Sequence, residues 1–129
     1  MRAGLVLSLL VAGSLHFALT SEHMEESAML GIGFIVAGLA QAALALLLLR
    51  APSRTNLALV ITLNAATVLL YLAHIFIGLP LGGGTLSKEE IAPSGIATKA
   101  AELAAIALSL GLIGRRQRER SRSEQRDAA

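Results

Sequence analysis

The sequence of 129 residues contains no cysteine and no tryptophan, and only 3% of its residues are aromatic. Without cysteine the chain can form no disulfide, bind no metal through thiolates and use no cysteine nucleophile. Charged residues account for 16% of the sequence, and six of the eleven basic residues fall within 115–126. The positive charge therefore belongs to a terminal tail and not to a basic face, which argues against nucleic-acid binding.

Long apolar runs dominate the rest of the chain. Apolar residues make up 54% of the sequence, and the mean hydropathy of +0.67 is high for a soluble domain. A helix that crosses the hydrocarbon core needs about 20 mostly apolar residues. Four stretches meet this requirement: 3–20, 28–49, 57–79 and 96–113. The sequence therefore predicts an all-α integral membrane domain over residues 1–114, an up-down four-transmembrane-helix bundle, with a basic tail over 115–129.

The placement of lysine and arginine predicts the orientation of these spans. Nine of the eleven basic residues are Arg2, Arg50, Arg54 and the six arginines of the tail. Because the cytoplasmic ends of transmembrane helices are rich in lysine and arginine, we expect the N- and C-termini in the cytoplasm. The expected location is the plasma (inner) membrane. The basic tail is expected to contact anionic lipid headgroups.

The first apolar run also has features of a secretory signal peptide. Arg2 precedes it, and Ala18 and Thr20 stand at potential cleavage positions. Threonine fits poorly before a cleaved bond, and the run is long for the apolar part of a signal peptide. We therefore expect the segment to be retained as the first span. If it were removed, three spans would remain and the C-terminus would still be cytoplasmic.

Three ionisable side chains fall within the predicted spans: His16, His74 and Glu102, with Lys99 near the start of the fourth span. Ionisable residues are costly in lipid, so each is a candidate for a functional site. At the helical rise of about 1.5 Å per residue, the three lie roughly 6–9 Å from the outer ends of their spans, in one layer. Tyr71 shares a helical stripe with His74 and completes the candidate intramembrane polar site.

Two kinds of cofactor suit this layer. Histidine together with carboxylate favours Zn, Mn or Fe(II), with His16, His74 and Glu102 as candidate metal ligands. Two histidines on separate spans could also ligate a haem iron, although few aromatic residues are present to pack against a porphyrin. The cofactor is left open between a divalent cation and the less favoured haem.

Above this layer, Glu22, His23 and Glu26 form a candidate outer mouth of the site. Glu22 and Glu26 are one helical turn apart and therefore share a face. A structural interpretation stands beside this one, because acidic residues in the first turn of the second span would complement its helix dipole. Ser21 would then be the N-cap of the second span, and Ser94 the N-cap of the fourth.

Two further patterns indicate helix packing. Gln41 and Asn64 lie about 10–12 Å from the inner ends of their spans by helical rise, and are expected to form a structural amide hydrogen bond. Small residues recur at fourfold spacing on the fourth span: Ala97, Ala101, Ala105 and Ser109. Small residues let membrane helices approach closely, so this ladder is expected to face another helix of the chain. A homo-oligomer or a membrane-protein partner is left open by the same pattern.

The outer loop over residues 80–95 contains Gly82–Gly84, a potential hinge, and a capping-box sequence at 87–90 that predicts a short helix. The loop is long enough to fold over the outer mouth as a lid. Its glycines do not form a phosphate loop, because the lysine-serine pair of such loops is absent.

Four functional classes follow from these observations. The leading interpretation is a non-catalytic membrane subunit or partner protein, in which the polar residues hydrogen-bond to one another. The alternative is a cation- or proton-handling binding or transport protein that uses the outer His/Glu layer. A haem-binding bundle is a further alternative. An enzyme is least favoured, since the sequence shows no motif for an activated nucleophile and no metalloprotease spacing.

Overall fold

The computed structural model describes residues 1–80, 88 and 90–128. Within these residues the chain is all-α, with four helices and no strand. The predicted hinge at Gly82–Gly84 and two residues of the capping-box sequence, Ser87 and Glu89, lie outside the described residues. The lid therefore stays a prediction.

The four helices are α1 (Arg2–Glu26), α2 (Ala28–Arg50), α3 (Arg54–Phe76) and α4 (Pro93–Asp127). All four are long and apolar enough to cross a membrane. The second and third helices agree with the predicted spans to within three residues at each end. The first and last helices are longer than predicted, by six residues after position 20 and by fourteen after position 113.

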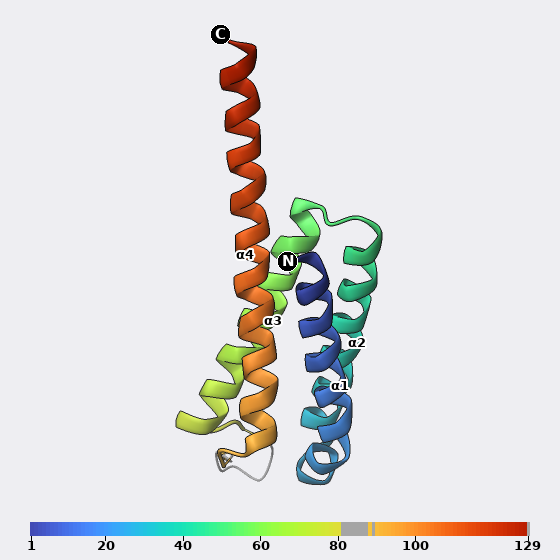
Figure 1. The fold of residues 1–129 in the computed structure, drawn as a ribbon. Coiled ribbons are helices and arrows are strands. Elements are labelled where there is room, and N and C mark those ends of the chain that lie inside the picture. The colour runs from blue at the N-terminus through green and yellow to red at the C-terminus, as the bar shows by residue number, and fades with distance from the viewer. Residues whose placement is uncertain (81–87, 89, 129) are drawn as a thin grey trace.

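The helices alternate in direction, so both chain termini lie toward the same end of the bundle (Figure 1). Each helix packs against the next one in the chain, and α4 packs back against α1, which closes a ring of four. Arg2, Arg50 and Arg54 mark one end of this ring, here called the basic end. At the opposite end, here called the far end, α3 diverges from α2 (Figure 1).

Side chains at the basic end satisfy backbone groups that the helix ends leave open. Ser53 Oγ accepts a hydrogen bond from the backbone N–H of Asn56 at 3.0 Å and so caps α3. The guanidinium group of Arg2 donates to the carbonyls of Leu48 and Leu49 at the end of α2. A cation in this position also opposes the negative end of the helix dipole. Arg2 therefore fastens α1 to α2.

The turn between α1 and α2 differs from the prediction. α1 continues to Glu26 and Ser27 is the N-cap of α2, so the expected cap at Ser21 is wrong. Glu22 and Glu26 lie near the end of α1, and the first turn of α2 contains no acidic residue. The predicted match between these acids and the dipole of the second span is therefore also wrong. The reason is that no glycine or proline stands between Thr20 and Ser27 to interrupt the helix.

The apolar core fills the half of the bundle next to the basic end. Its large fully buried members are Leu5, Leu9, Leu48, Leu57 and Val60. Many large apolar side chains outside this core are exposed, including most of those on the outward faces of α2 and α3. A bundle with so much apolar surface suits apolar surroundings, because water would drive such a surface to associate.

Two glycines allow α1 and α2 to approach closely near the middle of both helices. A Cβ atom added at Gly38 would lie 3.1 Å from the carbonyl oxygen of Gly13 and 3.0 Å from the ring of Phe17. A Cβ added at Gly13 would lie 3.2 Å from the carbonyl oxygen of Gly38. Glycine at both positions therefore allows backbone contact between the helices, as small residues do in membrane bundles.

The ladder of small residues predicted on the fourth span is only partly correct. Ala105 and Ser109 are buried, but Ala101 is half-buried and Ala97 is exposed. A residue spacing of four exceeds the helical repeat of about 3.6, so the ladder drifts around the helix. The buried face alternates three- and four-residue steps and consists of Gly95, Thr98, Glu102, Ala105 and Ser109.

The fourth helix extends well past the others. It starts at Pro93 with Ala92 as its N-cap, so the predicted cap at Ser94 is wrong. Proline suits the first helical position because its φ angle is already helical and no hydrogen bond is lost. The helix then continues without a break to Asp127 and projects beyond the basic end (Figure 1). The basic tail is therefore part of α4, and no change in secondary structure marks its start.

Candidate functional site

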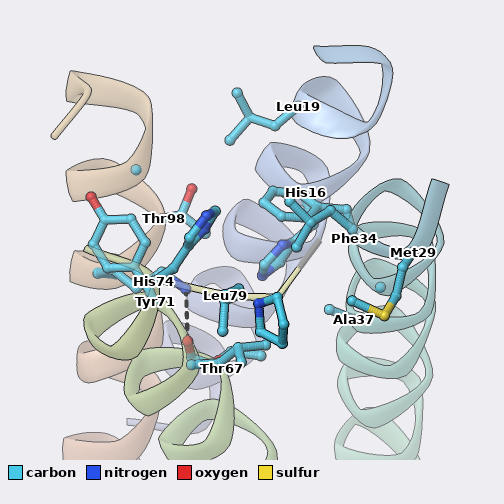
Figure 2. Close-up of a pocket in the computed structure, with 16 residues that line it drawn as sticks. His16, Leu19, Met29, Phe34, Ala37, Thr67, Tyr71, His74, Leu79 and Thr98 are labelled. Atoms are coloured by element: carbon cyan, nitrogen blue, oxygen red, sulfur yellow. Dashed lines mark hydrogen bonds between the residues drawn. The ribbon is translucent and has the colours of Figure 1, made fainter. Parts of the chain in front are cut away.

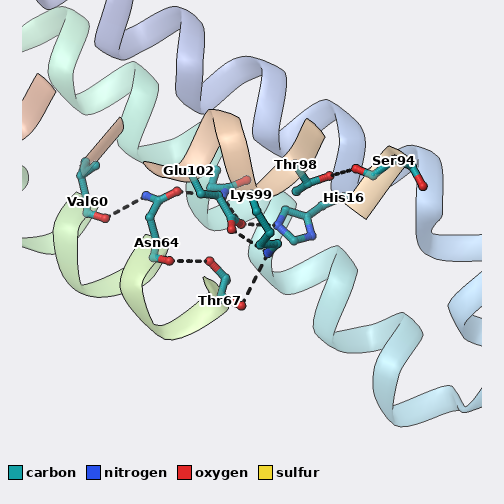
Figure 3. Close-up of polar contacts among 9 residues, drawn as sticks. His16, Val60, Asn64, Thr67, Ser94, Thr98, Lys99 and Glu102 are labelled. Atoms are coloured by element: carbon teal, nitrogen blue, oxygen red, sulfur yellow. Dashed lines mark hydrogen bonds and ion pairs between the residues drawn. The ribbon is translucent and has the colours of Figure 1, made fainter. Parts of the chain in front are cut away.

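A buried carboxylate lies at the centre of the candidate site. Glu102 on α4 is fully buried. Its Oε1 accepts a hydrogen bond from Nε2 of His16 on α1 at 2.9 Å, and its Oε2 lies 2.6 Å from Nζ of Lys99. Figure 3 shows these three side chains meeting between the helices. The predicted contact between His16 and Glu102 is confirmed, and Lys99 balances the charge of the carboxylate.

The predicted amide pair joins the same network. Nε2 of Gln41 on α2 donates to Oδ1 of Asn64 on α3 at 3.2 Å, which confirms the pair. The same nitrogen lies 3.3 Å from Oε1 of Glu102 and donates to it. Asn64 in turn donates from Nδ2 to the carbonyl of Val60 at 2.8 Å (Figure 3). One network therefore connects all four helices, where the sequence predicted two separate layers.

The network lies near the middle of the helices and not close to their far ends. α1 continues to Glu26 and α4 starts at Pro93. At the helical rise, His16 is therefore about 15 Å from the end of α1, and Glu102 is about 13 Å from the start of α4. The predicted depths were too small because the spans were taken to end near residue 20 and to begin at residue 96.

Lys99 is also held by groups on α3. Its Nζ lies 3.5 Å from the carbonyl oxygen of Thr67 and 5.3 Å from the centre of the Tyr71 ring. The negative face of an aromatic ring attracts a cation at this distance. Tyr71 therefore contacts the network through the lysine, although the sequence placed it in the site through its spacing from His74.

His74 is buried in another part of the site. Its Nε2 lies 3.9 Å from Oε1 of Glu26, at the end of α1. Among the described residues, no group of three or more histidine, cysteine, aspartate or glutamate side chains is placed to hold a metal ion. The predicted metal-ligand set of His16, His74 and Glu102 is therefore not assembled, because His16 turns to Glu102 and His74 turns to Glu26.

The three residues of the predicted outer mouth separate in the structure. Glu22 is exposed, whereas Glu26 is the residue that approaches His74. His23 points inward: it is buried, its Nδ1 bonds to the carbonyl of Leu19 at 2.9 Å, and its ring stacks on Phe34 with 3.9 Å between centroids. His23 therefore contributes to helix packing and does not line an opening together with Glu22.

A cavity of 320 Å³ lies between the network and the far end of the bundle. Figure 2 shows Tyr71 and His74 on one side of this cavity and His16 and Phe34 on the other. Most of its other lining residues are apolar or small, and all four helices contribute to it. No pattern in the sequence predicted this cavity. A signal for it was Gly33, which lines the space and where an added Cβ would meet no atom within 4 Å.

The two threonine hydroxyls that line this cavity are bound to backbone carbonyls of their own helices. The hydroxyl of Thr67 donates to the Asn64 carbonyl at 2.9 Å, and that of Thr98 donates to the Ser94 carbonyl at 2.8 Å. Neither hydroxyl is therefore directed at a general base, as a serine-type nucleophile would be.

Models of known protein families, curated proteins and solved structures were compared with this chain, and none of them matches it.

Proposed function

We propose that this chain is a non-catalytic integral membrane protein that acts as a subunit or partner of other membrane components. In this proposal the four helices cross the plasma (inner) membrane as an up-down bundle. The basic end faces the cytoplasm, with both termini, and the far end faces outward. The support for this orientation is the gathering of Arg2, Arg50 and Arg54 at one end of helices that are otherwise apolar.

The observation that carries the non-catalytic part of the proposal is that the buried charge of Glu102 is paired and its oxygen atoms have partners. A fully buried carboxylate is costly unless it is paired and hydrogen-bonded. Here Lys99 supplies the opposite charge, and His16 and Gln41 supply hydrogen-bond donors from two other helices. Such a network fixes how the helices meet, which is the function expected of buried polar groups in a scaffold.

The same geometry favours this function over the transport of protons or cations. A transport route needs polar groups that continue toward both ends of the bundle. Between the network and the basic end, the apolar core consists of buried leucines, valines and alanines, among them Leu9, Leu48 and Val60. The spans contain no ionisable residue in this half. Nε2 of His16 is already bonded to Glu102, so this residue could ligate a haem or metal only through Nδ1.

Cysteine labelling tests the proposed topology, since the chain has no cysteine of its own. In intact cells, a membrane-impermeant maleimide is expected to label Lys88→Cys, because the loop before α4 would face outward. Thr55→Cys and Ser123→Cys are expected to react only after the membrane is permeabilised. Val36→Cys, on the exposed apolar face of α2, serves as the control that stays unlabelled in both conditions.

Labelling of Thr55→Cys in intact cells, or protection of Lys88→Cys there, would contradict the four-span orientation.

The intact mass of the purified protein tests whether the first span is retained. We expect residues 1–20 to be retained, because α1 supplies Leu5 and Leu9 to the core and His16 to the network. A mass that lacks this segment would show that the first span is a cleaved signal peptide.

The proposed lipid contact of the basic tail is confined to its first turns. Because α4 is continuous, residue 126 lies about 20 Å beyond residue 113 at the helical rise. Electrostatic attraction to anionic headgroups fades over a screening length of about 8 Å in physiological salt. Arg115 and Arg116 fall within this reach, and Arg116 shares a surface hollow with Arg54 at the basic end. Arg122 and Arg126 lie outside it.

We therefore expect Arg115→Gln/Arg116→Gln to lower the affinity for phosphatidylglycerol by more than tenfold, at about 1 kcal/mol per arginine near the surface. The matched change Arg122→Gln/Arg126→Gln is expected to alter it by less than twofold. Native mass spectrometry of the protein titrated with phosphatidylglycerol in detergent, or its partition between neutral and anionic nanodiscs, measures the difference. Equal losses for the two pairs would mean that the tail lies flat along the headgroups.

A further inference from the structure

The cavity in the far half of the bundle opens sideways between α2 and α3. Met29 on α2 and Leu70 on α3 line it, and these side chains are 60% and 55% exposed. The two helices that carry them diverge toward this end (Figure 1). If the bundle spans a membrane, this opening faces the acyl chains and not the aqueous phase. A molecule dissolved in the lipid could then enter without crossing water.

A residue at the floor of the cavity carries a buried polar atom that has no partner in the protein. His16 lines the cavity, is 4% exposed, and donates from Nε2 to Glu102. A neutral imidazole that donates from one nitrogen presents the other as an acceptor. That atom, Nδ1, has no hydrogen-bond partner among the residues that the structure describes. Buried polar atoms are almost always paired, so an unpaired acceptor on a residue that lines a cavity calls for a donor.

The charge at this floor selects a neutral ligand. The ammonium group of Lys99 and the carboxylate of Glu102 are 2.6 Å apart and balance each other. A ligand with a charged head would add an unbalanced charge to a site that is closed to water on its inner side, which is unfavourable. The walls of the cavity are largely apolar, with Leu30, Phe34 and Leu79 among the lining residues. They suit a hydrocarbon body.

We propose that the cavity binds a neutral lipophilic alcohol, whose hydroxyl donates to Nδ1 of His16 and whose hydrocarbon body lies between α2 and α3. The volume of 320 Å³ is at the small end of the range of small-molecule sites, about 300–1,000 Å³. It accommodates one alkyl chain or a compact ring system. The proposal adds a ligand to the proposed scaffold function, and it relies on the membrane location only for the route of entry.

A photo-crosslinking experiment tests the assignment on the full chain in phosphatidylcholine nanodiscs. The probe is a medium-chain alkan-1-ol that carries a diazirine, and the matched probe is its methyl ether, which has the same body but no donor. We expect the alcohol to label lining segments of α2 and α3, mapped by mass spectrometry. Labelling by the ether is expected to be about fivefold weaker, as for the loss of one neutral hydrogen bond.

A cavity-filling variant locates the binding site. A Cβ added at Gly33 meets no atom within 4 Å, so Gly33→Leu is expected to occupy the space without disturbing the network. Labelling of α3 by the alcohol should then be lost, while helix content and the elution volume stay unchanged. The control is Val36→Leu, which enlarges an exposed side chain of the same helix that does not line the cavity. This control should leave the labelling unchanged.

Three results would overturn the proposal. Equal labelling by the alcohol and the ether in the wild-type protein would leave water as the partner of Nδ1 of His16. Labelling of α3 that survives in a folded Gly33→Leu protein would place the probe outside the cavity. Absence of alcohol-dependent labelling of the lining segments would mean that no such ligand binds. None of these results affects the cysteine-labelling test, so a failed ligand and a failed topology are distinguishable.

Discussion

Replacing Glu102 with glutamine is expected to lower the free energy of unfolding by about 3–5 kcal/mol, the usual cost of removing one partner of a buried ion pair. The physical reason is that Lys99 would remain in the bundle without the carboxylate that lies 2.6 Å from its Nζ. The substitution changes the volume of the side chain very little, so the loss reports charge and not packing. Titration with SDS in mixed micelles measures the unfolding free energy.

The double variant Lys99→Met/Glu102→Gln tests whether the loss comes from the unpaired charge of Lys99 or from any substitution at Glu102. With both charges removed, we expect most of the loss to be recovered, because no buried charge remains unpaired. Glu22→Gln, at an exposed position on α1, provides a control and should change stability by less than about 0.5 kcal/mol. If the loss in the double variant equals the sum of the losses in Lys99→Met and Glu102→Gln, Lys99 and Glu102 do not interact.

Enlarging Gly38 should also have a large effect. Gly38→Leu would force side-chain atoms into the space where the backbone of α1 passes, since even a Cβ atom lies 3.1 Å from the carbonyl oxygen of Gly13. Overpacking of this kind costs about 1–3 kcal/mol where the neighbours can shift. Backbone atoms shift less readily than side chains, so we expect the upper part of this range in the same SDS titration.

The matched control for Gly38→Leu is Gly33→Leu on the same helix. Both changes remove a helical glycine. This removal by itself stabilises the helix by about 1 kcal/mol. Only Gly38 faces a neighbouring backbone, whereas Gly33 faces the cavity. We expect Gly33→Leu to leave stability unchanged or slightly higher. Equal destabilisation by the two substitutions would show that α1 and α2 do not meet at Gly13 and Gly38.

Much of the fold could be predicted from the sequence, because the constraint that membrane spans impose acts locally. Residues 28–49 and 57–79 were expected to be helical over about the length they show, since every backbone polar group of a membrane span would have to be paired within it. The contact of His16 with Glu102 and the bond of Gln41 to Asn64 followed from the cost of isolated polar groups in lipid. These predictions required only the position of each polar residue along its helix and no knowledge of how the side chains pack.

Other features depend on packing that a linear pattern does not contain. The extension of α1 to Glu26 moved His16 toward mid-helix, and the start of α4 at Pro93 did the same for Glu102. Errors of a few residues in span ends thus became errors in depth, and the Gln41–Asn64 pair was not recognised as part of the same network. The partner of His74 and the cavity depend on how far α3 diverges from α2, which no residue spacing encodes.

The unbroken course of α4 gives the molecule a mechanical property. Glu102 and Asp127 lie on one helix, twenty-five residues apart, which corresponds to about 37 Å at the helical rise. Rotation of this rod by about 5° around the level of the carboxylate would carry its tip sideways by roughly 3 Å. A rigid tilt of α4 about Glu102 would thus displace its outer tip farther than the part of the helix beside the cavity.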